Sequence, residues 1–320
     1  MKQGSLITLS LAALLTLLGA VPSSAQDVPR TPWGAPSLEG AWTNATMTPL
    51  QRPADLADRE FLTLEELATR QGVVAERSSL DNRPRTETGA YNEFWMERGN
   101  LNRRTSLVID PPNGRLPALT GPEQDRQSRR TDSYIATRFD SWLDFNKLDR
   151  CITRGLPGAM MPGFYNHNYQ IVQTEDYVVI LVEMIHDARI VPLDGRAHLA
   201  PGLRQWLGDS RGHWDGDTLV IETTNFNDKI LGRGGTVFGG SEHLRVVERL
   251  TRVDAGTIDY EITVADPTVW TEPWTVSLPM APLEQAVFEY ACHEGNYALP
   301  NILSGARAEE REAAGQQQQQ

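Results

Sequence analysis

The sequence has little cysteine. Two cysteines, Cys151 and Cys292, are present among 320 residues, and they lie far apart in the chain. The lack of a CxxC motif argues against a thiolate metal site or a cysteine nucleophile. In an oxidising compartment, two such cysteines most simply form one long-range disulfide. Closing so long a loop would stabilise the fold by about 5 kcal/mol in the chain-entropy description.

Metal-binding motifs are also lacking. The 6 histidines include no HExxH motif and no pair at i, i+4 spacing. Asp209, Asp215 and Asp217 lie close together, but the twelve-residue pattern of a calcium loop is missing. We therefore predict no metal and no cofactor. The alternative is that ligands from separate strands converge on a metal ion.

The chain is short of positive charge. Its 30 Lys and Arg residues face 42 Asp and Glu residues, which gives a net charge of -12. Nucleic acids and anionic lipid surfaces are bound through Lys and Arg, so both are poor partners for this chain. We expect a small-molecule substrate or ligand instead.

Long apolar runs are missing after the N-terminus, so we predict no membrane insertion. At the N-terminus, Lys2 precedes an apolar stretch from Leu6 to Val21, and the small residues Ser23 and Ala25 follow. This pattern is typical of a cleaved signal peptide, here residues 1–25. We expect an exported protein, located in the periplasm or outside the cell.

Residues 26–150 show no regular alternation of apolar and polar residues. We therefore predict an irregular, partly helical N-terminal segment that wraps around the rest of the protein. Thr63 with Glu66 three residues later forms a capping-box pattern before a helical spacing over residues 62–77. A short strand is predicted over residues 106–110, where two prolines stop it. The glutamine repeat at the C-terminus predicts a disordered tail over residues 309–320.

From Tyr165 onward, β-rich runs alternate with turn signals, which predicts a mostly β fold. Asp215-Gly216 and the trio Asp254 to Gly256 are the clearest hairpin turns. Eight antiparallel strands could close a lipocalin-like barrel over residues 151–308, with room for one small ligand. The eight runs are residues 168–174, 177–185, 188–194, 218–226, 244–253, 257–266, 274–280 and 286–294.

One long string resembles a known group. The elements DGRAH (residues 194–198), GHWDGDTLVIET (residues 212–223) and VVER (residues 246–249) occur in this order. The chain resembles, from about Tyr165 to Asn301, a large group of exported bacterial proteins mostly described as hypothetical. The resemblance implies homology, but the group as a whole implies no single activity.

A serine nucleophile is disfavoured. Residues 208–212 match the GxSxG pattern around Ser210. That pattern requires a strand before the serine and a helix after it, whereas here a β-hairpin follows. We interpret this segment as a glycine-flanked loop that enters a strand.

The segment YVVILVEMIHDAR carries the candidate site. Its apolar residues lie on both faces, as in a strand buried on both sides, yet Glu183 interrupts them. If His186 and Asp187 form a two-residue turn, Glu183 lies diagonally near Arg189 and can form an ion pair with it. The structural interpretation is a polar hairpin tip; the functional one is a pocket at the end of the barrel.

The functional interpretation is an acid–base enzyme: a lyase, isomerase or hydrolase acting on a small molecule. Its catalytic residues would be His186 as proton carrier, His167 as a second one, and Asp187 and Glu183 to orient His186. Arg189 would hold a ligand oxyanion. The alternatives are a non-catalytic binding protein for an apolar or aromatic ligand, and a structural protein. Further substrate-binding candidates are Tyr165, Asn168, His213, Trp214, Trp274, Tyr290 and His293.

Overall fold

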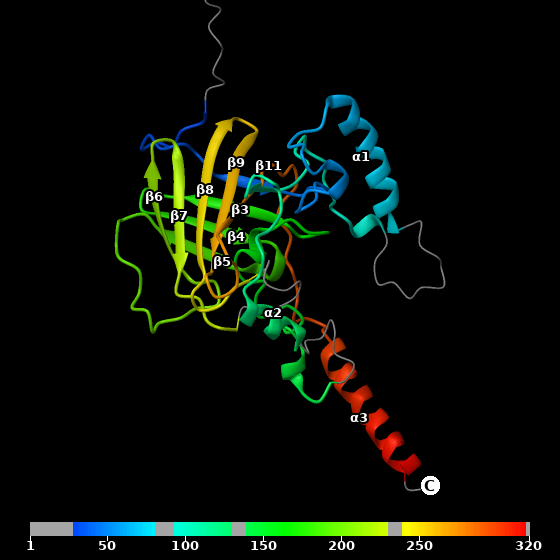
Figure 1. The fold of residues 1–320 in the computed structure, drawn as a ribbon. Coiled ribbons are helices and arrows are strands. Elements are labelled where there is room, and N and C mark those ends of the chain that lie inside the picture. The colour runs from blue at the N-terminus through cyan, green and yellow to red at the C-terminus, as the bar shows by residue number, and fades with distance from the viewer. Residues whose placement is uncertain (1–27, 81–92, 130–138, 230–238, 318–320) are drawn as a thin grey trace, which may run out of the picture.

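The structure is a computed structural model that describes residues 28–80, 93–129, 139–229 and 239–317. The predicted signal peptide lies outside these residues. Within the described ranges, no helix is both long and apolar enough to cross a membrane. Two antiparallel sheets form the body of the protein, and in Figure 1 the strands of one sheet run across those of the other.

The first sheet has five strands in the order β11-β1-β3-β4-β5. Its register pairs Ile171 of β3 with Ile180 of β4, and Ile180 with Arg189 of β5. The strands are β1 (Gly40–Thr43), β3 (Asn168–Gln173), β4 (Tyr177–Val182), β5 (Ala188–Pro192) and β11 (Ala281–Pro282).

The second sheet has six strands in the order β2-β10-β9-β8-β7-β6. Both predicted hairpins are confirmed. Gly216 and Asp217 form the turn between β6 and β7, so the predicted pair Asp215-Gly216 is one residue early, and residues 255–256 form the turn between β8 and β9. Gly216 adopts φ 60°, which a hairpin of this kind requires. The strands are β2 (Val108–Asp110), β6 (Asp209–Asp215), β7 (Thr218–Thr224), β8 (Arg245–Asp254), β9 (Thr257–Ala265) and β10 (Trp274–Ser277).

The prediction of a β-rich antiparallel fold is confirmed, but the described strands form two sheets and no closed barrel is found. β5 is hydrogen-bonded to β4 and ends the first sheet, while β6 ends the second. The eighth predicted strand, residues 286–294, is not a strand. Short strands from the N-terminal half, β1 and β2, complete the sheets instead.

The core lies between the sheets and is filled by large side chains. Trp42 and Tyr169 come from the first sheet, and Tyr260 and Trp274 come from the second; all four are buried. Burial alternates along β4: Val178, Ile180 and Val182 face the core, whereas the residues between them are partly exposed. The prediction that this strand is buried on both faces is therefore wrong.

In the described part of the chain, three α-helices lie outside the sheets: α1 (Leu64–Ser78), α2 (Gly121–Ser128) and α3 (Ala298–Gln317). The predicted capping box of Thr63 and Glu66 is confirmed at the start of α1. α3 extends away from the sheets (Figure 1) and includes residues 309–317, which were predicted to be disordered. Its many Ala, Glu and Gln residues are strong helix formers, which accounts for the difference.

Short 3-10 helices connect the other elements: η1 (Ala54–Leu56), η3 (Glu93–Trp95), η4 (Trp142–Asp144), η5 (Gly158–Met160) and η6 (Met184–His186). The predicted disulfide between Cys151 and Cys292 is present and closes a sequence separation of 141 residues. It fixes the segment that follows the last strand to the loop before β3.

Candidate functional site

The turn after β4 is longer than predicted. β4 ends at Val182 and β5 begins at Ala188, so the connection spans residues 183–187 and contains η6. The interpretation of His186-Asp187 as a two-residue turn is therefore wrong. Ile185 adopts φ 64° and His186 adopts φ 47°, which are uncommon for residues other than glycine. Such backbone conformations persist only where the surrounding contacts enforce them.

The predicted ion pair between Glu183 and Arg189 is also wrong. Glu183 is buried beyond the end of β4, where it accepts hydrogen bonds from Asn168 Nδ2 at 2.6 Å and from the backbone N–H of Phe288 at 3.1 Å. Arg189 faces the core on β5 and pairs with Glu248 of the opposite sheet at 2.9 Å. The longer turn separates the two side chains, because it removes the register that would have brought them together.

His186 and Asp187 contact different groups. The exposed His186 ring lies with Nδ1 3.1 Å from the Tyr290 carbonyl oxygen. Asp187 accepts a hydrogen bond from Thr153 Oγ1 at 2.8 Å, and burial raises the pKa of its carboxyl group. In the described part of the chain, neither Asp187 nor Glu183 hydrogen-bonds to the His186 ring. Tyr290 takes the orienting role that the sequence assigned to a carboxylate.

His167 and Asn168 lie close to this turn. The His167 ring is buried against the Arg154 guanidinium, and burial together with that charge holds the pKa of His167 well below its usual range. Asn168 Nδ2 joins two carboxylates, because it donates to Glu97 Oε2 at 3.0 Å as well as to Glu183. Burial, reinforced by the charge of Glu183, raises the pKa of Glu97.

The remaining predicted residues lie in four places. Tyr165 lies in the segment before β3, and Tyr290 and His293 lie beside the disulfide on the segment after the last strand. Trp274 is part of the core, with its ring centroid 5.8 Å from that of Trp270. His213 and Trp214 lie on β6 in the other sheet. Among the predicted residues that the structure describes, one group lies together around the turn after β4: His167, Asn168, Glu183, His186, Asp187 and Tyr290.

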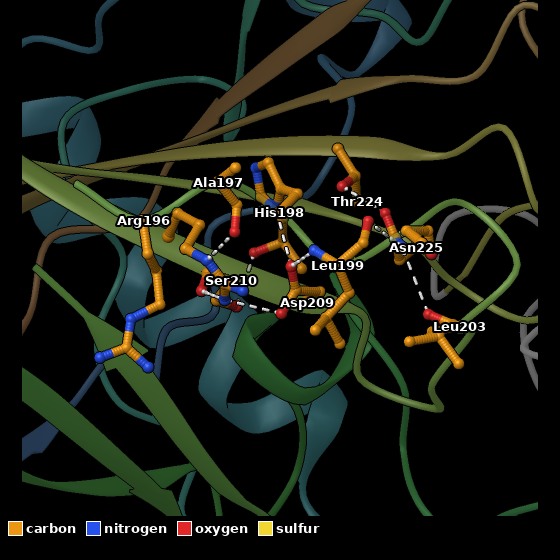
Figure 2. A network of polar contacts seen from close by, with 12 residues as sticks. Arg196, Ala197, His198, Leu199, Leu203, Asp209, Ser210, Thr224 and Asn225 are labelled. Atoms are coloured by element: carbon orange, nitrogen blue, oxygen red, sulfur yellow. Dashed lines mark hydrogen bonds and ion pairs between the residues drawn. The ribbon is translucent and has the colours of Figure 1, made fainter. Parts of the chain in front are cut away.

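A second polar centre, absent from the predicted site, lies beside β6 (Figure 2). His198 Nδ1 is 2.9 Å from Asp209 Oδ2, and the backbone N–H of Leu199 donates to the same oxygen at 3.0 Å. Arg211 Nη1 is 2.6 Å from the other oxygen, Asp209 Oδ1. The Asp209 carboxylate is buried, while the His198 ring is partly exposed. A histidine oriented by a fixed carboxylate is a recurrent acid–base arrangement.

The loop that carries His198 is held in place by Asn225. Asn225 Nδ2 lies within hydrogen-bond distance of the carbonyl oxygens of Leu199, Ala200 and Leu203, at 3.1, 3.0 and 3.3 Å. Its Oδ1 accepts a hydrogen bond from Thr224 Oγ1 at 2.9 Å (Figure 2). These contacts anchor residues 199–203 to the end of β7.

Gly208 makes the entry into β6 possible. It adopts φ 69°, and a Cβ at this position would lie 2.6 Å from the Thr224 carbonyl oxygen. Ser210, two residues after Gly208, lies within β6, and its Oγ is hydrogen-bonded to Thr223 Oγ1 at 2.8 Å. Ser210 is therefore a strand residue and not a nucleophile at a strand-to-helix turn, as its sequence context indicated.

Glu222 of β7 is a further titratable group. Arg245 lowers the pKa of Glu222, and the charges of His198 and His213 act in the same direction. Arg245 Nε contacts Glu222 Oε1 at 2.8 Å. Across the described ranges, no group of three or more His, Cys, Asp or Glu residues has the arrangement of a metal site. The centre has the composition of a proton-transfer site.

The sequence contained a signal for this centre. His198 is the last residue of DGRAH, and Asp209 precedes the GHWDGDTLVIET string. Both therefore lie in or next to the elements that carry the resemblance. Comparison with known proteins adds no assignment, since no family model, curated protein or solved structure matches this chain.

Proposed function

We propose that the protein is an exported acid–base enzyme that moves a proton on a small polar molecule, as a lyase or isomerase does. The observation that carries this proposal is the 2.9 Å contact between His198 Nδ1 and Asp209 Oδ2. A neutral imidazole whose Nδ1–H donates to a carboxylate presents Nε2 as the proton acceptor. Figure 2 shows the other edge of the His198 ring turned away from Asp209.

The environment of Asp209 supports this role. The Leu199 N–H and the Arg211 guanidinium fix both carboxylate oxygens, so the carboxylate is positioned before any substrate arrives. When Nε2 accepts a proton from the substrate, the imidazolium forms beside a fixed negative charge. Positioned general bases of this kind contribute roughly 10²–10⁴-fold to a rate.

The choice of His198 over His186 rests on these contacts. His186 Nδ1 lies beside a neutral carbonyl oxygen, which orients the ring but supplies no negative charge of its own. His167 is buried against Arg154, and a neighbouring cation opposes protonation. His198 is the histidine among the described residues that combines partial exposure with a buried carboxylate partner.

Hydrogen–deuterium exchange at carbon tests the proposal even while the product is unidentified. The protein is incubated in D2O with a panel of small ketones, 2-oxo acids and aldoses, and loss of the C–H signal next to the carbonyl is followed by proton NMR. The proton leaves carbon for His198 Nε2, and a deuteron from solvent returns. We expect exchange of at least one compound to be about 100-fold faster than in buffer.

Variants assign that exchange to the centre. His198→Gln should return the rate to that of buffer, and Asp209→Asn should lower it about tenfold or more. His243→Gln is the matched control, because His243 is exposed and its Nε2 is 3.7 Å from Glu242. An unchanged rate in His198→Gln would refute the proposal. If no compound exchanges faster than in buffer, a non-catalytic binding protein becomes the better interpretation.

A further inference from the structure

Large aromatic side chains are exposed at one end of the first sheet. Phe94, Trp95, Phe164 and Phe288 are 57–83% exposed. The rings of Phe94 and Trp95 form an edge-to-face pair with centroids 5.2 Å apart. Exposed apolar area of this kind is unfavourable in water, and when it is gathered in one place it marks a binding surface.

Hydrogen bonds join the three segments that carry these rings. The backbone N–H of Glu97, two residues after Trp95, donates to the Phe164 carbonyl oxygen at 2.7 Å. Two residues after Phe164, the Asn166 N–H donates to Glu97 Oε2 at 2.9 Å. The segment of Phe94 and Trp95 and the segment of Phe164 therefore meet at Glu97.

Phe288 is tied to the same place through Asn168, whose side-chain amide donates to both Glu97 and Glu183. Glu183 in turn accepts from the Phe288 N–H. Asn168 and Glu183 thus connect the third aromatic segment to the other two. We name the place where the segments that carry Trp95, Phe164 and Phe288 are joined through Glu97, Asn168 and Glu183 the aromatic end.

Negative charge at the aromatic end is not balanced by a basic side chain. Within the described ranges, neither Glu97 nor Glu183 forms an ion pair, and the adjacent Arg98 is held by Glu93 at 2.7 Å. Glu97 Oε2 accepts hydrogen bonds from Asn166 and Asn168. Among the residues that the structure describes, none donates a hydrogen bond to Glu97 Oε1, so this half-buried carboxylate keeps an oxygen for a ligand.

We infer that the aromatic end binds a small organic cation, of the class of a quaternary ammonium, with its charge beside Glu97 and its methyl groups against Trp95, Phe164 and Phe288. Aromatic faces attract cations through the ring quadrupole, and methylated ammonium groups also gain from burial against apolar rings. A carboxylate beneath the rings supplies the opposite charge. This site is separate from the His198 centre and does not depend on its activity.

Choline and its neutral carbon isostere, 3,3-dimethyl-1-butanol, test the inference directly. They have the same shape, so a difference in binding reports the positive charge. Titration of each into the full-length protein is followed by NMR through the Trp95 indole signal. We expect choline to bind with a dissociation constant at least about tenfold lower than that of the alcohol.

Variants locate the site. Glu97→Gln keeps an oxygen for the Asn166 and Asn168 hydrogen bonds but removes the charge, and it should weaken choline binding about tenfold or more. Trp95→Ala should weaken it as well, measured by calorimetry. Trp142→Ala is the matched control, because Trp142 is exposed elsewhere and lies against Arg150.

Either of two results would overturn the inference: equal binding of choline and the alcohol, including no binding of either, or unchanged choline binding in both Glu97→Gln and Trp95→Ala. Thermal unfolding followed by circular dichroism shows whether each variant is folded. If Glu97→Gln fails to fold, the comparison of Trp95→Ala with Trp142→Ala decides the question alone.

Discussion

The ion pair between Arg189 and Glu248 joins the two sheets through the core, and its loss should destabilise the whole fold. Both side chains are almost fully buried, at 1% and 0% exposure. Arg189 Nη1 donates to Glu248 Oε1 at 2.9 Å, its other terminal nitrogen bonds Oε2, and Tyr260 also donates to the carboxylate. Burial and Glu248 raise the pKa of Tyr260 well above its usual range, so the phenol stays neutral and remains a donor.

Arg189→Met removes the positive charge and leaves Glu248 buried without its partner. Breaking a buried pair in this way costs about 3–5 kcal/mol of unfolding free energy, because the remaining charge stays desolvated. For a domain of this size, that loss corresponds to a fall in Tm of roughly 6–20 °C. Urea unfolding and scanning calorimetry on the purified protein measure both quantities.

Two controls separate the buried charge from other effects. Arg249→Met breaks the exposed pair with Asp215, whose N–O distance is 3.1 Å, and should cost no more than about 1 kcal/mol. The double variant Arg189→Met with Glu248→Gln removes both charges while keeping an acceptor for Tyr260. It should regain about 2 kcal/mol relative to Arg189→Met alone. The reasoning is refuted if Arg189→Met costs no more than Arg249→Met, or if the double variant is less stable than Arg189→Met.

Two further predictions concern the loop around the disulfide. Burial raises the pKa of Asp187 above its unfolded value of 3.8, so its contribution to stability is present below that pH and is lost as pH rises through the folded pKa. Asp187→Asn should therefore gain stability relative to the wild type between about pH 4 and pH 7, and equal pH profiles in urea unfolding would contradict this. Reduction of the Cys151–Cys292 disulfide with a dithiol should lower the unfolding free energy by up to about 5 kcal/mol; an unchanged urea midpoint would show that the bond does not constrain the unfolded chain.

The local features of the fold could be predicted because each is specified by a few neighbouring residues. Gly216 fixes the hairpin between β6 and β7 through the positive φ that glycine accepts. Thr63 and Glu66 fix the start of α1 through reciprocal hydrogen bonds. Both patterns can be recognised from a short stretch of sequence, whatever the rest of the chain contains.

The sequence could not show whether the strands close into a barrel, because closure depends on which distant segments pair. β1 has four residues and β2 has three, too short to show a strand period, yet each occupies a place in a sheet. The eighth predicted strand, residues 286–294, has an alternating pattern, but the disulfide and the contacts of Phe288 and Tyr290 hold it across the end of the first sheet. For β1, β2 and residues 286–294, contacts with distant segments outweighed the local sequence pattern.

The turn after β4 shows the same limit within the candidate site. Its shape depends on two hydrogen bonds across the sheet, from Glu183 N to the Asn168 carbonyl oxygen at 3.0 Å and from Met184 N to that of Asn166 at 3.1 Å. Neither partner could be assigned from the sequence around His186. Because the turn is longer than predicted, the register between β4 and β5 differs from the predicted one. Arg189 therefore faces the core and pairs with Glu248.

The two histidine centres differ in what positions them, and that difference bears on function. A density of titratable residues in sequence pointed to His186, but the neighbours of a turn residue project in different directions, and its ring contacts a carbonyl of a distant segment. His198 and Asp209 are separated by eleven positions, and the intervening loop returns because Asn225 holds its carbonyl oxygens and Gly208 admits the sharp entry into β6. A proton-transfer site needs a partner group fixed in place, more than it needs many ionisable neighbours. For that reason the candidate base is His198.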